Sequence, residues 1–192
     1  MIAVIEYNAG NITSVVNAIN RLGFECMVTN DEKEIRNSTK VIFPGVGEAS
    51  SAMNYLKQNK LDTLICSLTQ PTLGICLGQQ LMCAHSEEGD TDCLGIFNAA
   101  VKKFPALDIV PHMGWNNLQN IKGNLLKEIS TDDNVYFVHS YYCELSENTI
   151  ATCDYILPFS AAMQKDNFYA TQFHPEKSAS VGEQILLNFL NL

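Results

Sequence analysis

The first half of the chain alternates between short apolar runs and segments in which apolar residues recur every three or four positions. The apolar runs are rich in β-branched residues and predict strands at 2–7, 25–30, 41–47 and 71–76. The periodic segments predict helices at 12–22, 49–68 and 77–86. Strands and helices therefore alternate, and such alternation is typical of a parallel sheet buried between helices.

The second half shows a different pattern. Short runs with aromatic and β-branched residues predict further strands, partly antiparallel, within 98–104, 108–119, 134–145, 148–164 and 167–176. The last segment, 180–192, again has helical spacing and is expected to pack on the sheet. We therefore expect an α/β fold with a mostly parallel central sheet and a smaller antiparallel sheet.

Composition favours one compact domain. The 192 residues are 46% hydrophobic and 17% charged, and no repeat, low-complexity tract or linker interrupts them. We expect a single domain over residues 1–192.

Charge and cysteine content narrow the class of protein. The formal net charge is −9, without a cluster of basic residues, which argues against a nucleic-acid partner. The N-terminus resembles neither an export signal nor a membrane span, so we expect a cytoplasmic protein that does not bind a membrane. The seven cysteines form no C-x-x-C pair, and neither a disulfide framework nor a metal site is predicted.

One of these cysteines occupies a special position. In TLGICLGQQL, Cys76 lies between Gly74 and Gly78, where a predicted strand runs into a predicted helix. Such a turn crowds the backbone, needs glycine neighbours, and projects the central side chain at the carboxyl end of the sheet. The start of the helix favours the thiolate and makes the N–H of Leu77 an oxyanion donor. The alternative is an ordinary tight turn with a buried cysteine.

A nucleophile needs a base, and TQFHPEKS contains the best candidate. His174 follows a predicted strand, and Glu176 projects from the same side two residues later, so its carboxylate can orient the imidazole. The alternative is a surface pair without consequence. The glycine-rich stretch FPGVG, which ends another strand, offers a second oxyanion donor, or is simply a strand-to-helix turn.

The chain resembles the class I (triad) glutamine amidotransferase family over nearly its whole length. The resemblance rests on a glycine-rich segment followed, in this order, by Cys76, His174 and Glu176. This resemblance implies a flavodoxin-like fold. Within the family, the motifs YNAGN, PGVG, GICLGQQLM, PHMGWN, FVHSYY and FHPEKS resemble the glutaminase subunits of imidazole glycerol phosphate synthases.

The resemblance implies a reaction and its residues. Cys76 attacks the side-chain amide of glutamine, ammonia leaves, and water hydrolyses the glutamyl thioester, without a cofactor or a metal. The residues implied beyond the triad are Val46 and Leu77 for the oxyanion, Gly47, Gln80 and Glu88 around glutamine, and Ser140 and Tyr141 near its carboxylate. Glu87 is an alternative to Glu88, and the loop HSEEGD can also be read as merely acidic and solvated.

The resemblance also implies a partner. In such enzymes, ammonia passes to a (β/α)₈ barrel synthase subunit that forms imidazole glycerol phosphate and AICAR in histidine biosynthesis, so we expect a heterodimer. The candidate contact residues are Asn11, Met113, Trp115, Asn116 and Lys177. His112 and His139 either pack near this interface or make hydrogen bonds in the core. Rotation of the peptide between Gly45 and Val46 is a hypothesis for control by the partner.

Some features leave alternatives open. The family more often has Asp-Tyr-Gly where this chain has Glu6, Tyr7 and Asn8, which puts the identity of the partner in doubt. A cysteine hydrolase with the same sheet, such as a peptidase or deglycase, would lack the His-Pro-Glu segment. A regulatory subunit without activity would not need Cys76, His174 and Glu176 together.

Overall fold

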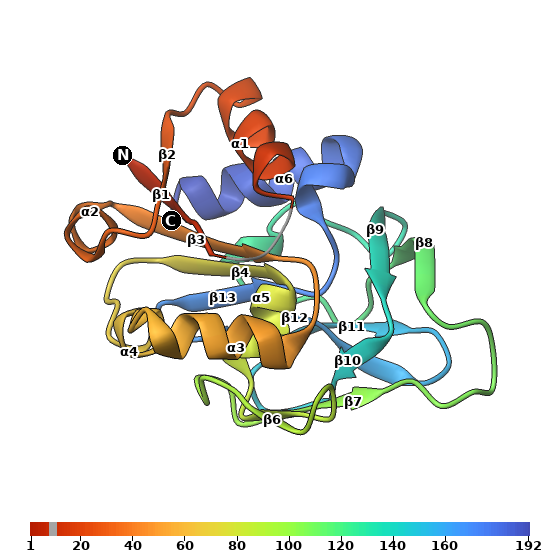
Figure 1. Ribbon diagram of the computed structural model, residues 1–192. Coiled ribbons are helices and arrows are strands. Elements are labelled where there is room, and N and C mark those ends of the chain that lie inside the picture. Colours follow the sequence, from red (N-terminus) through yellow and green to blue (C-terminus); the bar gives the residue numbers. More distant parts are fainter. Residues whose placement is uncertain (8–10) are drawn as a thin grey trace.

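A computed structural model describes residues 1–7 and 11–192 (Figure 1). Asn8, the unusual position noted above, lies outside the described residues. The central sheet has the strand order β11-β12-β13-β4-β3-β1-β2. Its strands are β1 (Ile2–Ile5), β2 (Cys26–Thr29), β3 (Lys40–Gly45), β4 (Thr72–Cys76), β11 (Thr149–Asp154), β12 (Pro158–Lys165) and β13 (Phe168–Thr171).

Five neighbouring strands of this sheet, from β2 to β13, run parallel, whereas β12 and β11 extend one edge antiparallel. The parallel strands are almost continuously buried, as their apolar sequences require. The predicted α/β fold with a mostly parallel central sheet is therefore confirmed.

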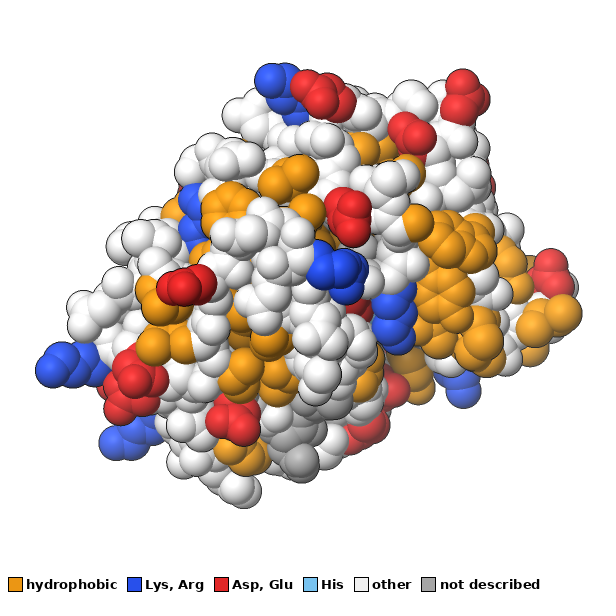
Figure 2. Space-filling view, turned by 90° about the horizontal axis from the view of Figure 1, so that it is seen from above, with side chains coloured by type: hydrophobic (Ala, Val, Ile, Leu, Met, Phe, Trp, Pro, Cys, Tyr) orange, Lys and Arg blue, Asp and Glu red, His pale blue; other side chains and the backbone are white. Residues whose placement is uncertain are grey.

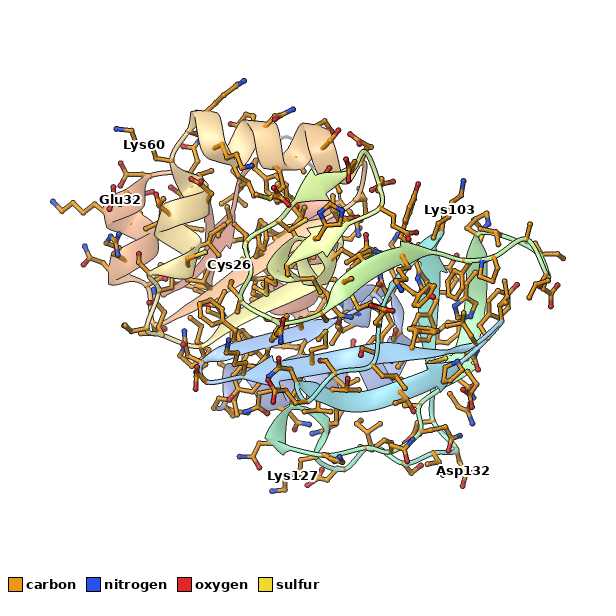
Figure 3. All side chains as sticks on the ribbon, turned by 90° about the horizontal axis from the view of Figure 1, so that it is seen from below. Cys26, Glu32, Lys60, Lys103, Lys127 and Asp132 are labelled. Atoms are coloured by element: carbon orange, nitrogen blue, oxygen red, sulfur yellow. The ribbon has the colours of Figure 1, made fainter. Side chains whose placement is uncertain are left out.

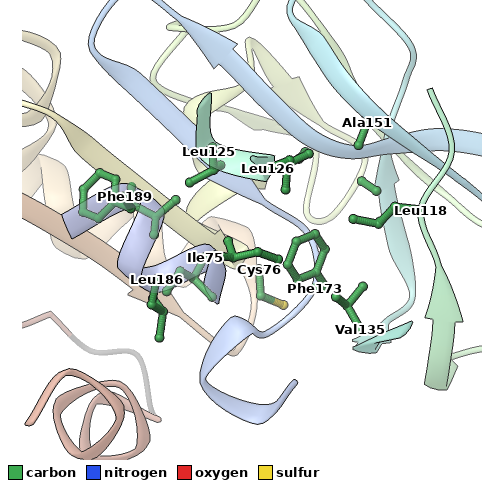
Figure 4. Close-up of a cluster of buried hydrophobic side chains, with 14 of the residues drawn as sticks. Ile75, Cys76, Leu118, Leu125, Leu126, Val135, Ala151, Phe173, Leu186 and Phe189 are labelled. Atoms are coloured by element: carbon green, nitrogen blue, oxygen red, sulfur yellow. The ribbon is translucent and has the colours of Figure 1, made fainter. Parts of the chain in front are cut away.

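Helices cover both faces of the sheet, and each face has its own hydrophobic cluster. One cluster joins the sheet to α1 (Ile12–Arg21) and α6 (Ala179–Leu190). The other joins it to α2 (Glu32–Asn37), α3 (Ala49–Gln58), α4 (Leu61–Cys66) and α5 (Leu77–Met82). Alternate residues of β1 belong to different clusters, because side chains of a strand alternate between its faces. Val4 packs in the first cluster and Ile5 in the second. Figure 4 shows part of the first cluster, in which Cys76 lies beside Ile75 and Phe173.

Two smaller sheets lie outside the central sheet. The four-stranded sheet has the order β10-β7-β5-β6 and contains β5 (His85–Ser86), β6 (Thr91–Asp92), β7 (Ala100–Lys103) and β10 (Tyr141–Cys143). A two-stranded ribbon pairs β8 (His112–Asn117) with β9 (Asn134–His139). Two short 3₁₀ helices, η1 (Asn124–Leu126) and η2 (Pro175–Lys177), complete the described elements.

The structure differs from the predicted helices in three places. The helix expected over 49–68 is divided, because Lys60 adopts a left-handed backbone with φ of 58°. The helix expected over 77–86 ends at Met82, and the chain then becomes extended to form β5. Helix α2 was not predicted, although the Asp31 side chain accepts a hydrogen bond from the Glu34 N–H at 3.0 Å, an N-terminal cap that the sequence pattern contains.

Many charged side chains lie at the periphery. Figure 3 shows Glu32, Lys60, Lys127 and Asp132 pointing away from the body of the fold. In the described part of the chain, no helix combines the length and hydropathy needed to cross a bilayer.

Candidate active site

Cys76 ends β4 and occupies the position directly before α5, as the sequence predicted. Its φ of 54° is a left-handed conformation that a non-glycine residue adopts only under constraint. The glycines nearby leave room for this turn: a Cβ on Gly78 would lie 2.0 Å from the carbonyl oxygen of Phe43, and one on Gly45 would lie 2.1 Å from the Tyr7 hydroxyl. The crowded turn that projects Cys76 is therefore real, and side chains are excluded around it.

Strand pairing brings His174 to the same end of the sheet. β13 pairs in parallel with β4, with Thr171 opposite Ile75, so the chain that follows β13 passes beside Cys76. The His174 N–H donates to the carbonyl oxygen of Tyr136 at 2.9 Å, which fixes the backbone there.

The imidazole of His174 is held by Glu176, and both side chains are buried. Nδ1–H of His174 donates to Oε1 of Glu176 at 2.7 Å, because a carboxylate can only accept. The side-chain amide of Asn11 donates to the same oxygen at 2.5 Å. With Nδ1 occupied, Nε2 is the nitrogen left to exchange a proton.

The pKa of His174 reflects these neighbours. Burial disfavours the imidazolium, but the Cys76 and Glu176 side chains outweigh burial and raise the pKa to about 10. Cys76 raises this pKa both as a hydrogen-bond acceptor and through its charge, although Nε2 of His174 makes no hydrogen bond of ordinary geometry among the described residues. Nε2 is thus free to meet the thiol once the two groups align.

Cys76 opens into a cavity of about 350 Å³. Every residue that the resemblance places around glutamine lines it. The lining residues are Val46, Gly47, Cys76, Leu77, Gln80, Glu88, Pro111, Val138, His139, Ser140 and Tyr141. Leu77 is the first residue of α5, where N–H groups lack partners within the helix, and Val46 follows β3.

Two adjacent glutamates differ in their surroundings. Glu88 lines the cavity, and its Oε2 accepts a hydrogen bond from the Ala49 N–H at 2.8 Å. Burial, supported by the charge of Glu48, raises the pKa of Glu88 despite that bond. Glu87 is exposed and accepts from the Lys103 N–H at 2.8 Å. Of the two, Glu88 is the one that faces the cavity.

A pair of glutamines supports the cavity wall. Nε2 of Gln80 donates to the Tyr141 carbonyl oxygen at 3.0 Å and to Oε1 of Gln172 at 3.1 Å. Nε2 of Gln172, which is fully buried, points toward Sγ of Cys76 across 3.8 Å. Sequence reasoning missed Gln172, although it has the same strand parity as His174 and could have been found on that ground.

Other neighbours of the site carried weaker signals in the sequence. The cavity is also lined by Pro111, Val138 and His139, and no local sequence pattern predicts these positions. The Tyr7 hydroxyl is buried and has no partner among the described residues. Burial, and then the nearby Cys76 side chain, raise the pKa of Tyr7.

The predicted contact residues divide into two groups. Met113 is 62% exposed, Trp115 is 55% exposed, and Lys177 is exposed as well. Asn11 and Asn116 are half-buried, and their amides donate within the chain, Asn11 to Glu176 and Asn116 to the Asp154 carbonyl oxygen at 3.0 Å. Figure 2 shows hydrophobic side chains gathered on the right, the side where β8 and β9 lie in Figure 1.

Comparison with known proteins connects this geometry to a family. A family model described as Glutamine amidotransferase class-I matches residues 3–192. The chain belongs to this family. It is thus a glutamine amidotransferase, and the predicted membership is confirmed.

The relatives are more specific. Imidazole glycerol phosphate synthase subunit HisH of Bacteroides fragilis is 58% identical, over 100% of this chain and 99% of its own. The same subunit of Bacteroides thetaiotaomicron is 55% identical with the same coverage. The resemblance to this group of glutaminase subunits is therefore confirmed.

Solved structures support the fold. A crystal structure of a putative GMP synthase component from Thermoplasma acidophilum superposes with a TM-score of 0.78 at 20% identity, covering 100% of this chain and 92% of that one. This amidotransferase therefore shares its architecture with proteins of quite different sequence.

The raised pKa of His174 predicts a pH effect on stability. Between the ordinary pKa of histidine and about 10, the folded chain holds a proton that the unfolded chain releases, so the free energy of unfolding falls as pH rises through this window. Glu176→Gln removes one of the two charges that favour the imidazolium, and Cys76 remains. We expect the decrease in unfolding free energy from pH 7 to pH 10 to be smaller in this variant, as measured by urea denaturation. Equal decreases in the two proteins would contradict the assigned pairing.

Proposed function

We propose that this amidotransferase is the glutaminase subunit of imidazole glycerol phosphate synthase and acts as one domain over residues 1–192. The single observation that carries the proposed chemistry is the convergence of Cys76, His174 and Glu176 at one end of the sheet, beside a cavity that fits an amino acid. The full-length identity to HisH subunits supports the choice of pathway.

The reaction begins at Cys76. His174 holds the proton of the Cys76 thiol at Nε2, because Nδ1 is bonded to Glu176 and the raised pKa of the ring favours the imidazolium, and Sγ attacks the side-chain carbonyl carbon of glutamine. The oxygen of the tetrahedral intermediate becomes negative. The N–H groups of Leu77 and Val46, whose residues both line the cavity beside Cys76, are the proposed donors to it.

The intermediate then collapses. The C–N bond breaks, and His174 returns its proton to the departing nitrogen, which leaves as ammonia. Water next attacks the glutamyl thioester, His174 again takes a proton, and glutamate is released with Cys76 restored. Glu176, which accepts a hydrogen bond from Asn11, holds the imidazole in one orientation throughout.

The cavity provides contacts for the rest of glutamine. We assign the α-ammonium group to Glu88, whose burial makes a counter-charge favourable, and the α-carboxylate to the segment of Ser140 and Tyr141. Gly47 and Gln80 border the same space. Gln80 also fixes the wall through the Tyr141 carbonyl oxygen.

Ammonia that escapes into water becomes mostly ammonium, which is not nucleophilic, so the proposed function requires a docked acceptor. We propose a (β/α)₈ barrel synthase subunit, in a cytoplasmic heterodimer, that converts the ammonia into imidazole glycerol phosphate and AICAR. The exposed side chains of Met113, Trp115 and Lys177 form the proposed contact.

Glutamine hydrolysis tests this proposal. Turnover is measured for the chain alone, with the barrel subunit, and with the barrel subunit plus its nucleotide substrate. We expect activity to rise at each step, in keeping with control through the peptide between Gly45 and Val46. Equal turnover in all three conditions would count against this partner.

Trp115→Ala should weaken the complex. Exposed tryptophans at interfaces often contribute about 2 kcal/mol or more, so we expect the dissociation constant to rise about 30-fold in titration calorimetry. Val28→Ala is the matched control, since Val28 is 41% exposed on β2, at the opposite edge of the central sheet from β11. The proposed docking surface is wrong if both variants bind like the native chain.

A further inference from the structure

Four groups form a continuous line of hydrogen bonds between β8 and the cavity wall. Nδ2 of Asn116 lies 3.4 Å from Nε2 of His112, and Nδ1 of His112 lies 2.9 Å from Nε2 of His139. Nδ1 of His139 lies 2.7 Å from the carbonyl oxygen of Tyr141. Both histidines are buried, and neither takes part in the proposed chemistry.

The direction of every bond in this line follows from its last member. A carbonyl oxygen only accepts, so Nδ1 of His139 must carry a proton. In a neutral ring, Nε2 of His139 is then an acceptor, and Nδ1–H of His112 must be its donor. Nε2 of His112 is therefore an acceptor too, and the amide N–H of Asn116 donates to it.

Burial keeps both rings neutral, as this assignment requires. It lowers the pKa of His112 to about 4 and that of His139 to about 3. The surroundings of His112 are aromatic: its ring stacks on Tyr155 with centroids 4.1 Å apart and on Phe137 with centroids 4.8 Å apart. A ring held between two others cannot easily turn to exchange its nitrogens.

The line ends where the substrate is expected. His139 and Tyr141 line the cavity, whereas His112 does not. His112 and His139 are direct partners in the antiparallel ribbon, so the hydrogen bond between their side chains fixes the cavity end of β9. The Tyr141 carbonyl oxygen receives one bond from His139 and another from Gln80, which together set the course of the wall.

We propose that His112 is a positioning residue for glutamine binding: through its Nδ1–H it holds His139 in the tautomer that fixes the Ser140–Tyr141 wall. This inference rests on the proposed glutaminase function. His112 touches neither the substrate nor the reacting atoms, so its effect is on KM rather than on the chemical step.

The tautomers can be observed without any activity. The full chain is labelled with a nitrogen isotope in its histidines and studied by NMR at neutral pH. The signals of His112 and His139 are assigned by their loss in His112→Asn and His139→Asn. We expect both rings to be neutral, with the proton on Nδ1. A proton on Nε2 of either ring, or an imidazolium, would overturn the proposal.

Two substitutions separate positioning from mere packing. In His112→Asn, the asparagine amide can place an N–H where Nδ1 of His112 was, so the hydrogen bond to His139 is kept. In His112→Gln, the longer side chain places its amide where Nε2 of His112 was, so the donor to His139 is lost. In the complex with the barrel subunit, we expect KM for glutamine to stay within about threefold of native in His112→Asn. It should rise about tenfold in His112→Gln, equivalent to about 1.4 kcal/mol, with kcat changed less than KM.

A purely structural role predicts another result, in which both variants lose melting temperature and kcat alike, and this would overturn the proposal. Absence of glutamine hydrolysis by the native complex would overturn the proposed function and the binding role with it. The NMR result would still decide the direction of the hydrogen bonds, so the two failures are distinguishable.

Discussion

Cys76→Ala should abolish glutamine hydrolysis, with turnover reduced on the order of 10⁴-fold or more. The reason is that the thioester cannot form without Sγ, and no other thiol lines the cavity in the described part of the chain. Turnover is measured as glutamate formed by the complex with the barrel subunit. The fold should persist, because the substitution removes a single buried atom at a turn whose φ of 54° the alanine inherits.

A second cysteine provides the control. Cys153 is buried in β11 and lies outside the cavity lining, so Cys153→Ala tests the loss of a buried thiol without touching the site. We expect this variant to keep nearly native turnover. Substantial hydrolysis by Cys76→Ala would show that the nucleophile is elsewhere.

His174→Asn should lower kcat about 10³-fold, the usual range for loss of a general base. Asparagine can still donate to Glu176, but it cannot accept and return a proton at the position of Nε2. Since Cys76 remains, the residual activity should exceed that of Cys76→Ala and should rise with pH as the thiolate forms without help.

His85→Asn is the matched control for this variant. His85 is half-exposed on β5, and its ring nitrogens lie 3.2 Å from Asp90 and Asp92. Its loss should leave kcat unchanged. If His174→Asn and His85→Asn lost activity equally, His174 would have no special part in proton transfer.

Local patterns predicted the parts of the site that local geometry determines. The pattern of Gly74, Cys76 and Gly78 predicts a crowded strand-to-helix turn, because only glycine fits beside such a turn. The spacing of His174 and Glu176 predicts their contact, since side chains two residues apart in an extended segment lie on the same face. The parallel sheet followed from strands that are apolar on both faces.

Other features depend on contacts between distant segments and carried no such signal. The choice between Glu87 and Glu88 is made by Lys103 and Ala49, which lie elsewhere in the sequence. Asn11 reaches Glu176 across the chain, and His112 meets His139 only because β8 and β9 pair in one register. Periodicity also could not locate the break at Lys60, where a left-handed residue interrupts otherwise continuous helical spacing.

Covalent labelling by a diazoketone analogue of glutamine probes the nucleophile and the cavity together, because this electrophile needs both recognition in the cavity and an activated thiol. The complex with the barrel subunit is treated with the analogue, digested and examined by mass spectrometry. We expect a single adduct on Cys76, strongly reduced in His174→Asn. An unmodified Cys76, with labelling instead at the exposed Cys66, would contradict this expectation.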